Sequence, residues 1–313
     1  MTKQQILFLF KALVSFGVLF FLLKDVNSEE LFLKLKSITY FHVLTSLLFS
    51  IFAVIIISYR WRLILHHLKI KITFLDSISA TFSGLFIGQV LPGAIGIDVV
   101  RGMMVWKKNL SKKNLILSLI FDRAISLFAI LLIITCSIFF LLPYFPNNLV
   151  IAFYIAIATL LISILILILL VKYQKLNFLE NLINLAMKKL GISDHEFSLQ
   201  YFTKITSLSI LGHFFIIISA FFLSLSIGMD SKISVWFLLM PIIIFATAVP
   251  ISINGWGVRE GAMVYLWKIF GVPENEILLT SLCIGFVSVL ASLPGIWFWI
   301  KRKNNIKTEL KIL

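Results

Sequence analysis

Long uninterrupted apolar runs constrain the fold of this chain more than any other feature. The clearest one, residues 149–171, contains no charged residue. A bilayer core about 30 Å thick is crossed by roughly 20 helical residues, so a run of this length can span it. Because hydrocarbon offers no partner to backbone polar groups, each spanning segment must pair them internally, as a helix does. The sequence therefore predicts an all-α integral membrane protein.

The composition supports this class and argues against a nucleic-acid-binding protein. Hydrophobic residues make up 60% of the chain and charged residues 13%, whereas soluble domains contain about 25% charged residues. The net charge is +14, but the basic residues cluster beside the apolar runs, which is the pattern of the positive-inside rule. We expect all four clusters to face the cytoplasm. They are Arg60, Arg62, Lys69 and Lys71; Lys107, Lys108, Lys112 and Lys113; Lys172, Lys175, Lys188, Lys189 and Lys204; and Lys301, Arg302 and Lys303.

These clusters predict a polytopic helical bundle with about six full spans and both termini in the cytoplasm. The spans lie near 5–23, 42–59, 115–142, 149–171, 207–227 and 276–300. We interpret residues 1–313 as a single multi-pass domain of the cell membrane. Its halves, roughly 1–171 and 207–313, are joined by a cytoplasmic connector, 172–206. Two interpretations of the connector stay open, an amphipathic helix at the interface and a solvated linker.

Two further segments, 74–105 and 235–274, must begin and end on the same side of the membrane. Each contains a break rich in proline and glycine, and the simplest solution is a re-entrant hairpin that turns there. The first would open to the cytoplasm and the second to the outside, which relates them as an inverted repeat. Irregular backbone at membrane depth must be buried or line a wet cavity, so the two breaks should face each other. The predicted turn residues are Pro92, Gly93, Gly96, Pro250, Gly255 and Gly257.

Charged residues follow both breaks. Arg101 comes after Asp98, and Arg259 is next to Glu260. An arginine near exposed helix ends favours an anion such as a phosphate headgroup. Two readings are open: the arginines bind a ligand at membrane depth, or they lie in the headgroup region and only anchor their helices. The carboxylates could likewise simply neutralise the arginines.

The pair Asp122 and Arg123 lies about two helical turns inside the span 115–142, which favours a functional or paired role. The predicted substrate-binding residues are Arg101, Arg259, Asp98, Glu260, Asp122 and Arg123.

Other reactive residues do not form a recognisable catalytic or metal site. His213 lies well inside a predicted span, where it could relay protons or be held by a neighbouring hydroxyl or carbonyl group. Cys136 and Cys283 have neither metal-type nor disulfide-type spacing. The chain also has no nucleophile elbow and no metal-binding histidine pair. We therefore predict no catalytic residue, no metal and no cofactor.

Several blocks of sequence resemble the transmembrane-region family of lysylphosphatidylglycerol synthases. They are LPGAIGIDVVRG at 91–102, FDRAISLF at 121–128, VPISINGWGVREGA at 249–262, FGVPENE at 270–276 and SLPG at 292–295. In that family the flippase-like membrane region occurs alone or joined to a soluble aminoacyltransferase domain. We expect the soluble domain to be absent from this chain. The resemblance implies a translocation role. The residues that match the motif blocks are Pro92, Gly96, Asp98, Arg101, Asp122, Arg123, Pro250, Gly255, Gly257, Arg259 and Glu260.

The sequence therefore favours a flippase-like protein that binds a membrane lipid with an anionic headgroup and translocates it. The candidate lipids are an aminoacyl-phosphatidylglycerol, another phospholipid and a polyprenyl-phosphate-linked glycan. Two alternatives remain, a phosphatidylglycerol lysyltransferase-type enzyme and a non-transporting membrane partner of a glycan-synthesis enzyme.

Overall fold

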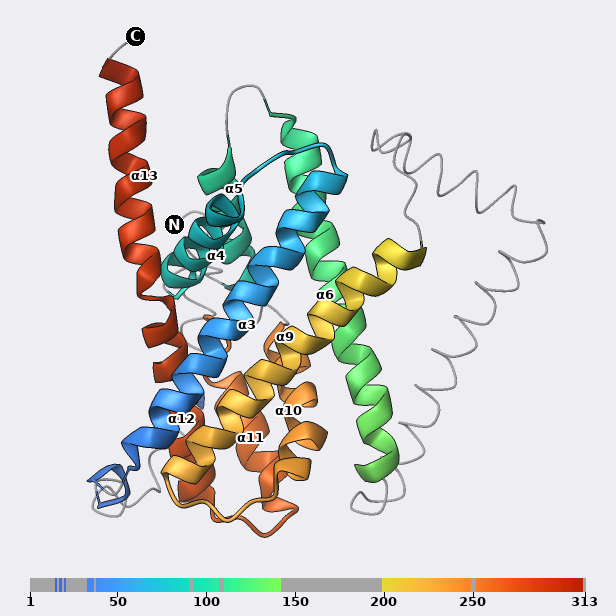
Figure 1. The fold of residues 1–313 in the computed structure, drawn as a ribbon. Helices are drawn as coiled ribbons and strands as arrows, with labels where there is room; N and C mark the ends of the chain where they lie inside the picture. Colours follow the sequence, from blue (N-terminus) through green and yellow to red (C-terminus); the bar gives the residue numbers. More distant parts are fainter. Residues whose placement is uncertain are drawn as a thin grey trace, which may run out of the picture.

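The computed structural model describes residues 38–89, 93–106, 110–141, 199–248 and 252–311, together with 33–36, Ser15, Gly17, Val18 and Phe20. Within these residues every regular element is an α-helix and no strand occurs. The helices are α3 (Tyr40–His67), α4 (Phe74–Gly88), α5 (Gly93–Val105), α6 (Lys112–Leu141), α9 (Leu199–Ser226), α10 (Ile233–Ala248), α11 (Val258–Lys268), α12 (Glu274–Ser292) and α13 (Pro294–Lys311) (Figure 1). The predicted all-α membrane bundle is confirmed.

Four of the predicted spans correspond to helices that are long and apolar enough to cross a membrane. These are Tyr40–His67, Lys112–Ser137, Gln200–Ser226 and Glu274–Arg302, the last formed by α12 and α13. The predicted span 149–171 and nearly all of 5–23 lie outside the described residues, as does connector segment 172–198. Residues 199–206, which the sequence analysis assigned to the connector, already belong to α9.

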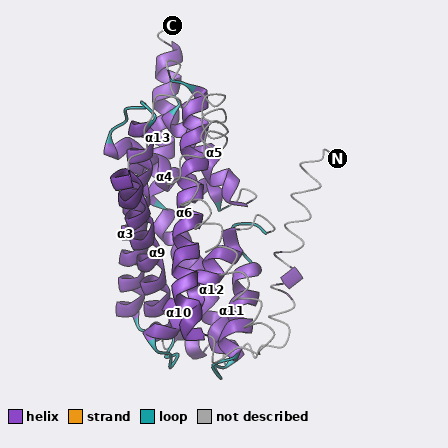
Figure 2. Cartoon of the chain, turned by 90° about the vertical axis from the view of Figure 1, so that its right-hand side faces the viewer, coloured by secondary structure: helices purple, strands orange, loops and turns teal. Residues whose placement is uncertain are grey.

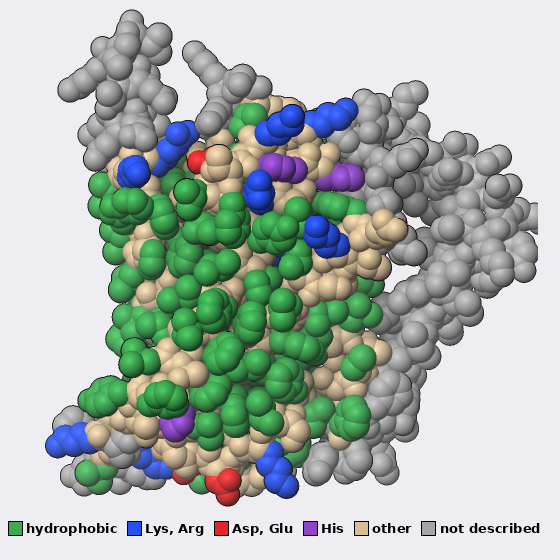
Figure 3. Space-filling view, in the orientation of Figure 1, with side chains coloured by type: hydrophobic (Ala, Val, Ile, Leu, Met, Phe, Trp, Pro, Cys, Tyr) green, Lys and Arg blue, Asp and Glu red, His purple; other side chains and the backbone are tan. Residues whose placement is uncertain are grey.

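The surface of the bundle has the layering of a membrane protein. Figure 3 shows a broad band of hydrophobic side chains, with charged and histidine side chains concentrated at its two ends. The exposed apolar residues of the membrane-length helices include Leu44, Leu48 and Ile120. A large exposed apolar surface is costly in water but matches lipid chains, so the band marks the bilayer-facing region.

The first hairpin consists of α4 and α5. Thr73 starts α4 with a capping box, in which its hydroxyl accepts a hydrogen bond from the Asp76 N–H at 3.1 Å. Further along α4, Gly84 and Gly88 lie one turn apart, and a methyl group on either would collide with Ile97 of α5. Small residues at this spacing let two helix backbones approach closely. The glycines of α4 therefore fix how tightly the hairpin closes.

The second hairpin consists of α10 and α11, which contribute most of the buried residues of the largest apolar cluster among the described residues. Trp236 of α10 and Trp267 of α11 are both fully buried there, with ring centroids 4.6 Å apart. The connection between the two helices contains three residues with positive φ, Asn254 at 47°, Gly255 at 82° and Gly257 at 83°. Glycine adopts this conformation without the penalty that a Cβ atom imposes. The two glycines thus permit a tight reversal of the chain.

The two hairpins occupy opposite halves of the bundle and meet at their tips. Two perpendicular views place α4 and α5 in the half near α13, and α10 and α11 in the other half (Figures 1 and 2). At the meeting point, Asn254 Nδ2 donates a hydrogen bond to Gln89 Oε1 at 2.5 Å. The prediction that the two breaks face each other is confirmed by this contact.

Two further helix contacts complete the packing of the bundle, one between α3 and α9 and the other between α13 and the first hairpin. α3 packs along α9, where Ser219 forms hydrogen bonds with Ser46 and Ser50, each at 2.8 Å. At the start of α13, Gly295 lies so close to the Phe82 backbone that a Cβ atom would collide with it. Close packing without a side chain therefore docks α13 against the first hairpin.

The hairpin arrangement predicts which surface positions share a side of the membrane. In a chain with Cys136 and Cys283 replaced by alanine, we expect Lys71→Cys and Lys113→Cys to react from one side. Asp230→Cys and Lys268→Cys should react from the other, because α10 and α11 return to the face from which they enter. Labelling of sealed, oriented vesicles with a membrane-impermeant thiol reagent measures this. Labelling of positions 71 and 113 from opposite sides would show that residues 74–105 cross the membrane.

Candidate functional site

A cavity of about 560 Å³ lies where the two hairpin tips meet. Its wall includes Gln89 at the tip of the first hairpin and Asn254 at the tip of the second. Helices α3, α6, α9, α10 and α12 contribute much of the remaining wall, which is largely apolar with several hydroxyl groups. We call this space the central cavity. Among charged side chains, Asp98, Arg123 and Arg259 line it.

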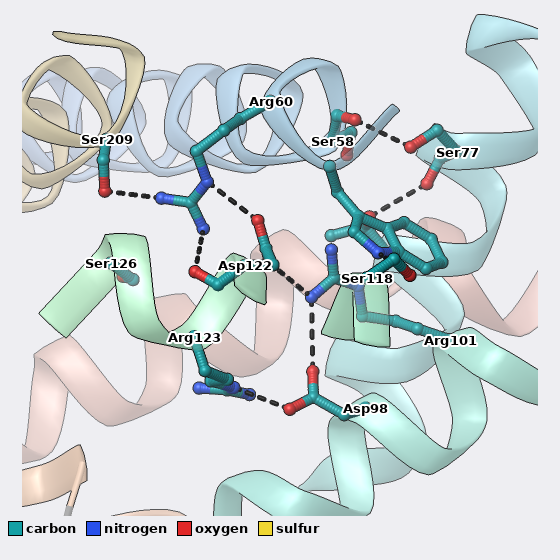
Figure 4. A network of polar contacts seen from close by, with 12 residues as sticks. Ser58, Arg60, Ser77, Asp98, Arg101, Ser118, Asp122, Arg123, Ser126 and Ser209 are labelled. Carbon is teal, nitrogen blue, oxygen red and sulfur yellow. Dashed lines mark hydrogen bonds and ion pairs between the residues drawn. The ribbon is translucent and has the colours of Figure 1, made fainter. Parts of the chain in front are cut away.

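Behind one wall, five charged residues form a continuous network, shown in Figure 4. Its centre is Asp122 of α6, which is 2% exposed. One carboxylate oxygen accepts from Arg60 Nε of α3 at 2.8 Å, and the other accepts from Arg101 Nη1 of α5 at 3.0 Å. A buried carboxylate is costly unless charged donors satisfy it. Asp122 is therefore the point at which three helices are joined.

The network continues from Arg101 to the central cavity through Asp98. Arg101 Nη1 also donates to Asp98 Oδ1 at 3.2 Å, and Arg123 Nε donates to Asp98 Oδ2 at 2.6 Å. The exposed fraction of the side chain rises from 4% at Arg101 to 14% at Asp98 and 38% at Arg123. Arg123 is thus the most exposed member of the five-residue network, and it lines the cavity together with Asp98.

Trp61 holds Arg101 in its interior position. The Arg101 guanidinium carbon lies 4.2 Å from the Trp61 ring centroid, and the indole N–H donates to Ser118 Oγ at 3.2 Å. A guanidinium stacked on a desolvated indole gains cation–π attraction. Within the described residues, however, Arg101 Nε and Nη2 have no hydrogen-bond partner. Ring stacking substitutes for part of the hydrogen bonding that a buried guanidinium requires.

The second hairpin contributes a separate ion pair. Arg259 Nε and Nη2 donate to Glu260 Oε1 at 3.0 and 2.6 Å, and the Ser281 hydroxyl donates to the same oxygen at 3.1 Å. The other oxygen of Glu260 accepts from the Gly257 N–H at 2.6 Å, which closes the first turn of α11. A carboxylate at a helix N-terminus is favoured by the helix dipole. Glu260 therefore both caps α11 and aligns Arg259.

Arg259 stacks on an aromatic ring, and a glycine borders both groups. The guanidinium carbon of Arg259 is 4.7 Å from the Trp256 ring centroid. A Cβ atom at Gly285 of α12 would lie 2.5 Å from Arg259 Nη2 and would also collide with the indole. Trp256, Arg259 and Gly285 all line the central cavity. The absence of a side chain at position 285 thus makes the space in which the arginine sits.

Uncharged polar groups complete the cavity wall. His213 of α9 is held through Nε2 by Ser126 of α6, at 3.2 Å from the carbonyl oxygen and 3.4 Å from the hydroxyl. A carbonyl or hydroxyl holding this ring is what the second interpretation of His213 predicted. The described residues offer no partner to His213 Nδ1 or to the Ser252 hydroxyl, although both residues are buried.

The predicted site residues fall into two sets. Asp98, Arg123, Arg259 and Gly255 line the central cavity, whereas Arg101, Asp122 and Glu260 lie behind its wall. Gly93 and Gly96 belong to the first turns of α5, and Gly257 precedes α11. Pro92 and Pro250 lie outside the described residues. Both Arg101 and Arg259 are buried, at 3% and 9% exposed, rather than extended to the membrane surface.

One sequence prediction is wrong. Arg60 was assigned to a basic cluster facing the cytoplasm, but it is 3% exposed and pairs with Asp122. The reason is its depth, because α3 continues for seven residues beyond it, to His67. No local signal marks Arg60 as different from Arg62. The signal that could have identified Arg60 is Asp122, because a carboxylate inside a predicted span requires a basic partner from another helix.

A family described as "Lysylphosphatidylglycerol synthase TM region" matches residues 8–295. The chain belongs to this family. The match includes both hairpins, the five-residue network and the Arg259–Glu260 pair. A comparison with curated proteins gave no match.

Membership in the lysylphosphatidylglycerol synthase TM region family makes this a membrane protein related to lipid handling. The central cavity is the chemically distinctive part of the described chain, because cationic and uncharged polar groups converge there at membrane depth. Groups of three or more histidine, cysteine, aspartate or glutamate residues that could hold a metal ion are absent from the part of the chain described. Arginine and hydroxyl groups are instead donors suited to oxyanions.

Removing the central carboxylate of the network should destabilise the protein. Asp122→Asn leaves Arg60 and Arg101 without their shared partner, and breaking a buried pair in this way costs about 3–5 kcal/mol. Asp98→Asn should cost less, because Arg101 retains Asp122 and Asp98 is more exposed. Thermal unfolding in detergent measures both. Equal unfolding temperatures for Asp122→Asn and the unsubstituted protein would contradict a structural role for this network.

Gly285 should be intolerant of even a small side chain. Gly285→Ala forces either the Trp256 ring or the Arg259 guanidinium to move, because both occupy the space that the methyl group needs. We expect Trp256 fluorescence to shift while the helical content measured by circular dichroism is retained. Gly271→Ala is a control, because nothing lies within 4 Å of its Cβ position, although its positive φ costs some stability. An unchanged spectrum in Gly285→Ala would contradict the tight packing.

Proposed function

We propose that this protein binds a membrane lipid with an anionic headgroup in the central cavity and moves that headgroup across the bilayer. The observation that carries the proposal is the meeting of two opposed hairpin tips at a cavity lined by Arg123 and Arg259. Arginine at membrane depth is costly and typically marks a substrate path. Sites between inverted repeats near the midplane are typical of transporters.

The cavity-lining arginines are the groups that would contact the phosphate. A guanidinium presents donors in a planar fork that matches two oxygens of a phosphate, and such charge-assisted bonds are strong. Each arginine is oriented by a carboxylate, Arg123 by Asp98 and Arg259 by Glu260. Arg101, Asp122 and Glu260 would then act as positioning residues for the groups in the cavity.

The size of the cavity favours a headgroup rather than a whole lipid. Volumes of roughly 300–1,000 Å³ accommodate drug-sized ligands, and the central cavity has about 560 Å³. Acyl chains would remain in the bilayer, to which exposed apolar residues of the bundle are suited. A headgroup in the cavity would thus exchange its hydration for arginine and hydroxyl groups while the chains stay in lipid.

Two contacts would have to rearrange to change the side of access. The Gln89–Asn254 hydrogen bond joins the hairpin tips, and the Arg123–Asp98 ion pair joins α6 to the first hairpin. Movement of one repeat against the other around a fixed site is a common transport mechanism. An anionic ligand that competes for Arg123 would weaken the second contact and so favour movement of α5.

A headgroup-accessibility assay tests the proposal. Full-length protein in proteoliposomes should translocate fluorescent phosphatidylglycerol, aminoacylated phosphatidylglycerol or a polyprenyl phosphate. Arg123→Gln and Arg259→Gln should each lower the rate at least about tenfold, because a hydrogen bond to a charged group contributes about 1.5–3 kcal/mol. Arg62→Gln is the matched control, since Arg62 lies outside the cavity and network.

Arg101→Gln is informative in a different way. It should lower the unfolding temperature as well as the rate, because Arg101 lies within the network and not in the cavity wall. If no lipid crosses, or if folded Arg123→Gln and Arg259→Gln transport as fast as Arg62→Gln, the proposal fails.

A further inference from the structure

We propose that anionic headgroups bind in the central cavity together with a proton, which is taken up at His213 Nδ1. This inference rests on the proposed function, to which it adds a second, coupled ion. Two observations carry it. One nitrogen of the His213 ring is held by the protein while the other has no partner among the described residues, and the ring lacks a carboxylate partner of its own there.

The way in which the ring is held decides which nitrogen can gain a proton. The Ser126 carbonyl oxygen lies 3.2 Å from His213 Nε2, and a carbonyl can only accept, so Nε2 carries a proton and donates it. Nδ1 is therefore the nitrogen that can gain or lose a proton. It is buried without a hydrogen-bond partner in the described part of the chain, on a residue that lines the central cavity. Protonation would turn Nδ1 into a donor at the wall of the space that the headgroup is proposed to enter.

The surroundings of the ring provide no carboxylate dedicated to it. At this level α9 packs on α3 with Gly212 next to Ile57, and Arg60, one turn further along α3, donates to Ser209 of α9. Helices α10 and α12 line the cavity with uncharged residues. The charged residues on the surrounding elements are Arg60 on α3, Asp98 on α5, Asp122 and Arg123 on α6, Arg259 and Glu260 on α11, and, more than two turns away on α9 itself, Lys204. Each carboxylate in this set accepts a hydrogen bond from an arginine, and among the described residues none is hydrogen-bonded to His213.

An oxyanion in the cavity would supply the partner that a protonated ring needs. Its oxygens can accept a hydrogen bond from Nδ1–H as they do from a guanidinium, and a negative charge nearby favours the charged form of a histidine. An unperturbed imidazole changes its charge near neutral pH, which makes histidine suited to such coupling. Because linkage is reciprocal, an anion that favours the proton must itself bind more tightly when the ring carries that proton.

Coupling at this ring would give the proposed transport a driving force. The proton would offset one negative charge of the headgroup at membrane depth, where an uncompensated charge is expensive. If the headgroup and the proton leave the cavity together, a difference in pH across the membrane biases the direction in which the lipid moves. His213 would then be a coupling residue, whereas Arg123 and Arg259 would bind the headgroup itself.

Equilibrium binding as a function of pH tests the inference. We expect the affinity of the full-length protein in detergent for phosphatidylglycerol to rise as the pH falls from about 8 to about 5.5, the range in which histidine titrates. The steepest possible gain is about tenfold per pH unit, which corresponds to the uptake of one proton per lipid. Calorimetry in two buffers with different ionisation enthalpies counts the protons directly. If phosphatidylglycerol does not bind, another lipid from the translocation assay takes its place.

His213→Gln and His42→Gln form a matched pair of variants. Glutamine at position 213 can still donate to the Ser126 carbonyl but does not titrate, so binding at about pH 8 should be retained and the gain at lower pH lost. His42 Nδ1 likewise has no partner in the described chain, but His42 stacks on Phe222 and lies outside the cavity, so His42→Gln should keep the pH profile. The profiles of the variants are compared with one another, because titration of the lipid affects all of them equally. Circular dichroism and unfolding temperature verify that each variant is folded.

The outcomes separate this inference from the proposed function. Binding that is equally tight at every pH, or a profile that is unchanged in folded His213→Gln, would overturn the proton coupling while leaving lipid binding intact. Loss of the profile in His42→Gln as well would show that the effect is not specific to the cavity, and would overturn it too. His213→Asn, which also does not titrate, replaces His213→Gln if that variant does not fold. If no lipid of the translocation assay binds at any pH, the proposed function fails together with the inference.

Discussion

The described structure depends on the placement of charge where water cannot solvate it. Asp122 could not remain ionised at 2% exposure without Arg60 and Arg101, and each of those arginines needs a carboxylate for the same reason. Because the three residues come from α6, α3 and α5, mutual compensation fixes how the first hairpin sits against two spanning helices. Apolar packing holds the helices together but has little directional preference, whereas these ion pairs permit few other arrangements.

Features that are local in the sequence could be predicted from it. Apolar runs marked the four described spans, and the breaks with glycine and proline marked the two hairpins. Pairing of the neighbours Arg259 and Glu260 was one of the readings that the sequence left open, and the structure contains this ion pair. The tightness of the first hairpin was missed, because Gly84 and Gly88 act through Ile97 of another helix. Such contacts depend on which helix faces become partners, which the apolar pattern of a membrane helix does not encode.

Asp122 and Arg123 show why the cavity wall could not be predicted residue by residue. Adjacent residues on a helix point about 100° apart, so one of the two entered the network core while the other faced the cavity. Sequence reasoning treated them as one site because they are neighbours in the chain. Arg101 and Arg259 both follow a hairpin break in the sequence, and we predicted the same role for both. Only Arg259 lines the cavity, because Arg101 instead contacts Trp61 and Asp122 behind its wall. Arg60 was misassigned because it belongs to a basic cluster in the sequence. In the structure it lies about 10 Å before the end of α3, where it is buried.

The two cavity arginines are tethered in different ways, and this asymmetry bears on the proposed transport. Arg259 pairs with the next residue of its own helix, so movement of the second hairpin carries both charges together. Arg123 pairs with Asp98 across two helices, so the same contact is made or broken when the first hairpin moves against α6. The cost of separating that pair falls if a phosphate takes the place of Asp98. An anionic headgroup would thus shift the position of the first hairpin through Arg123, while Arg259 would hold the ligand without a comparable dependence on hairpin position.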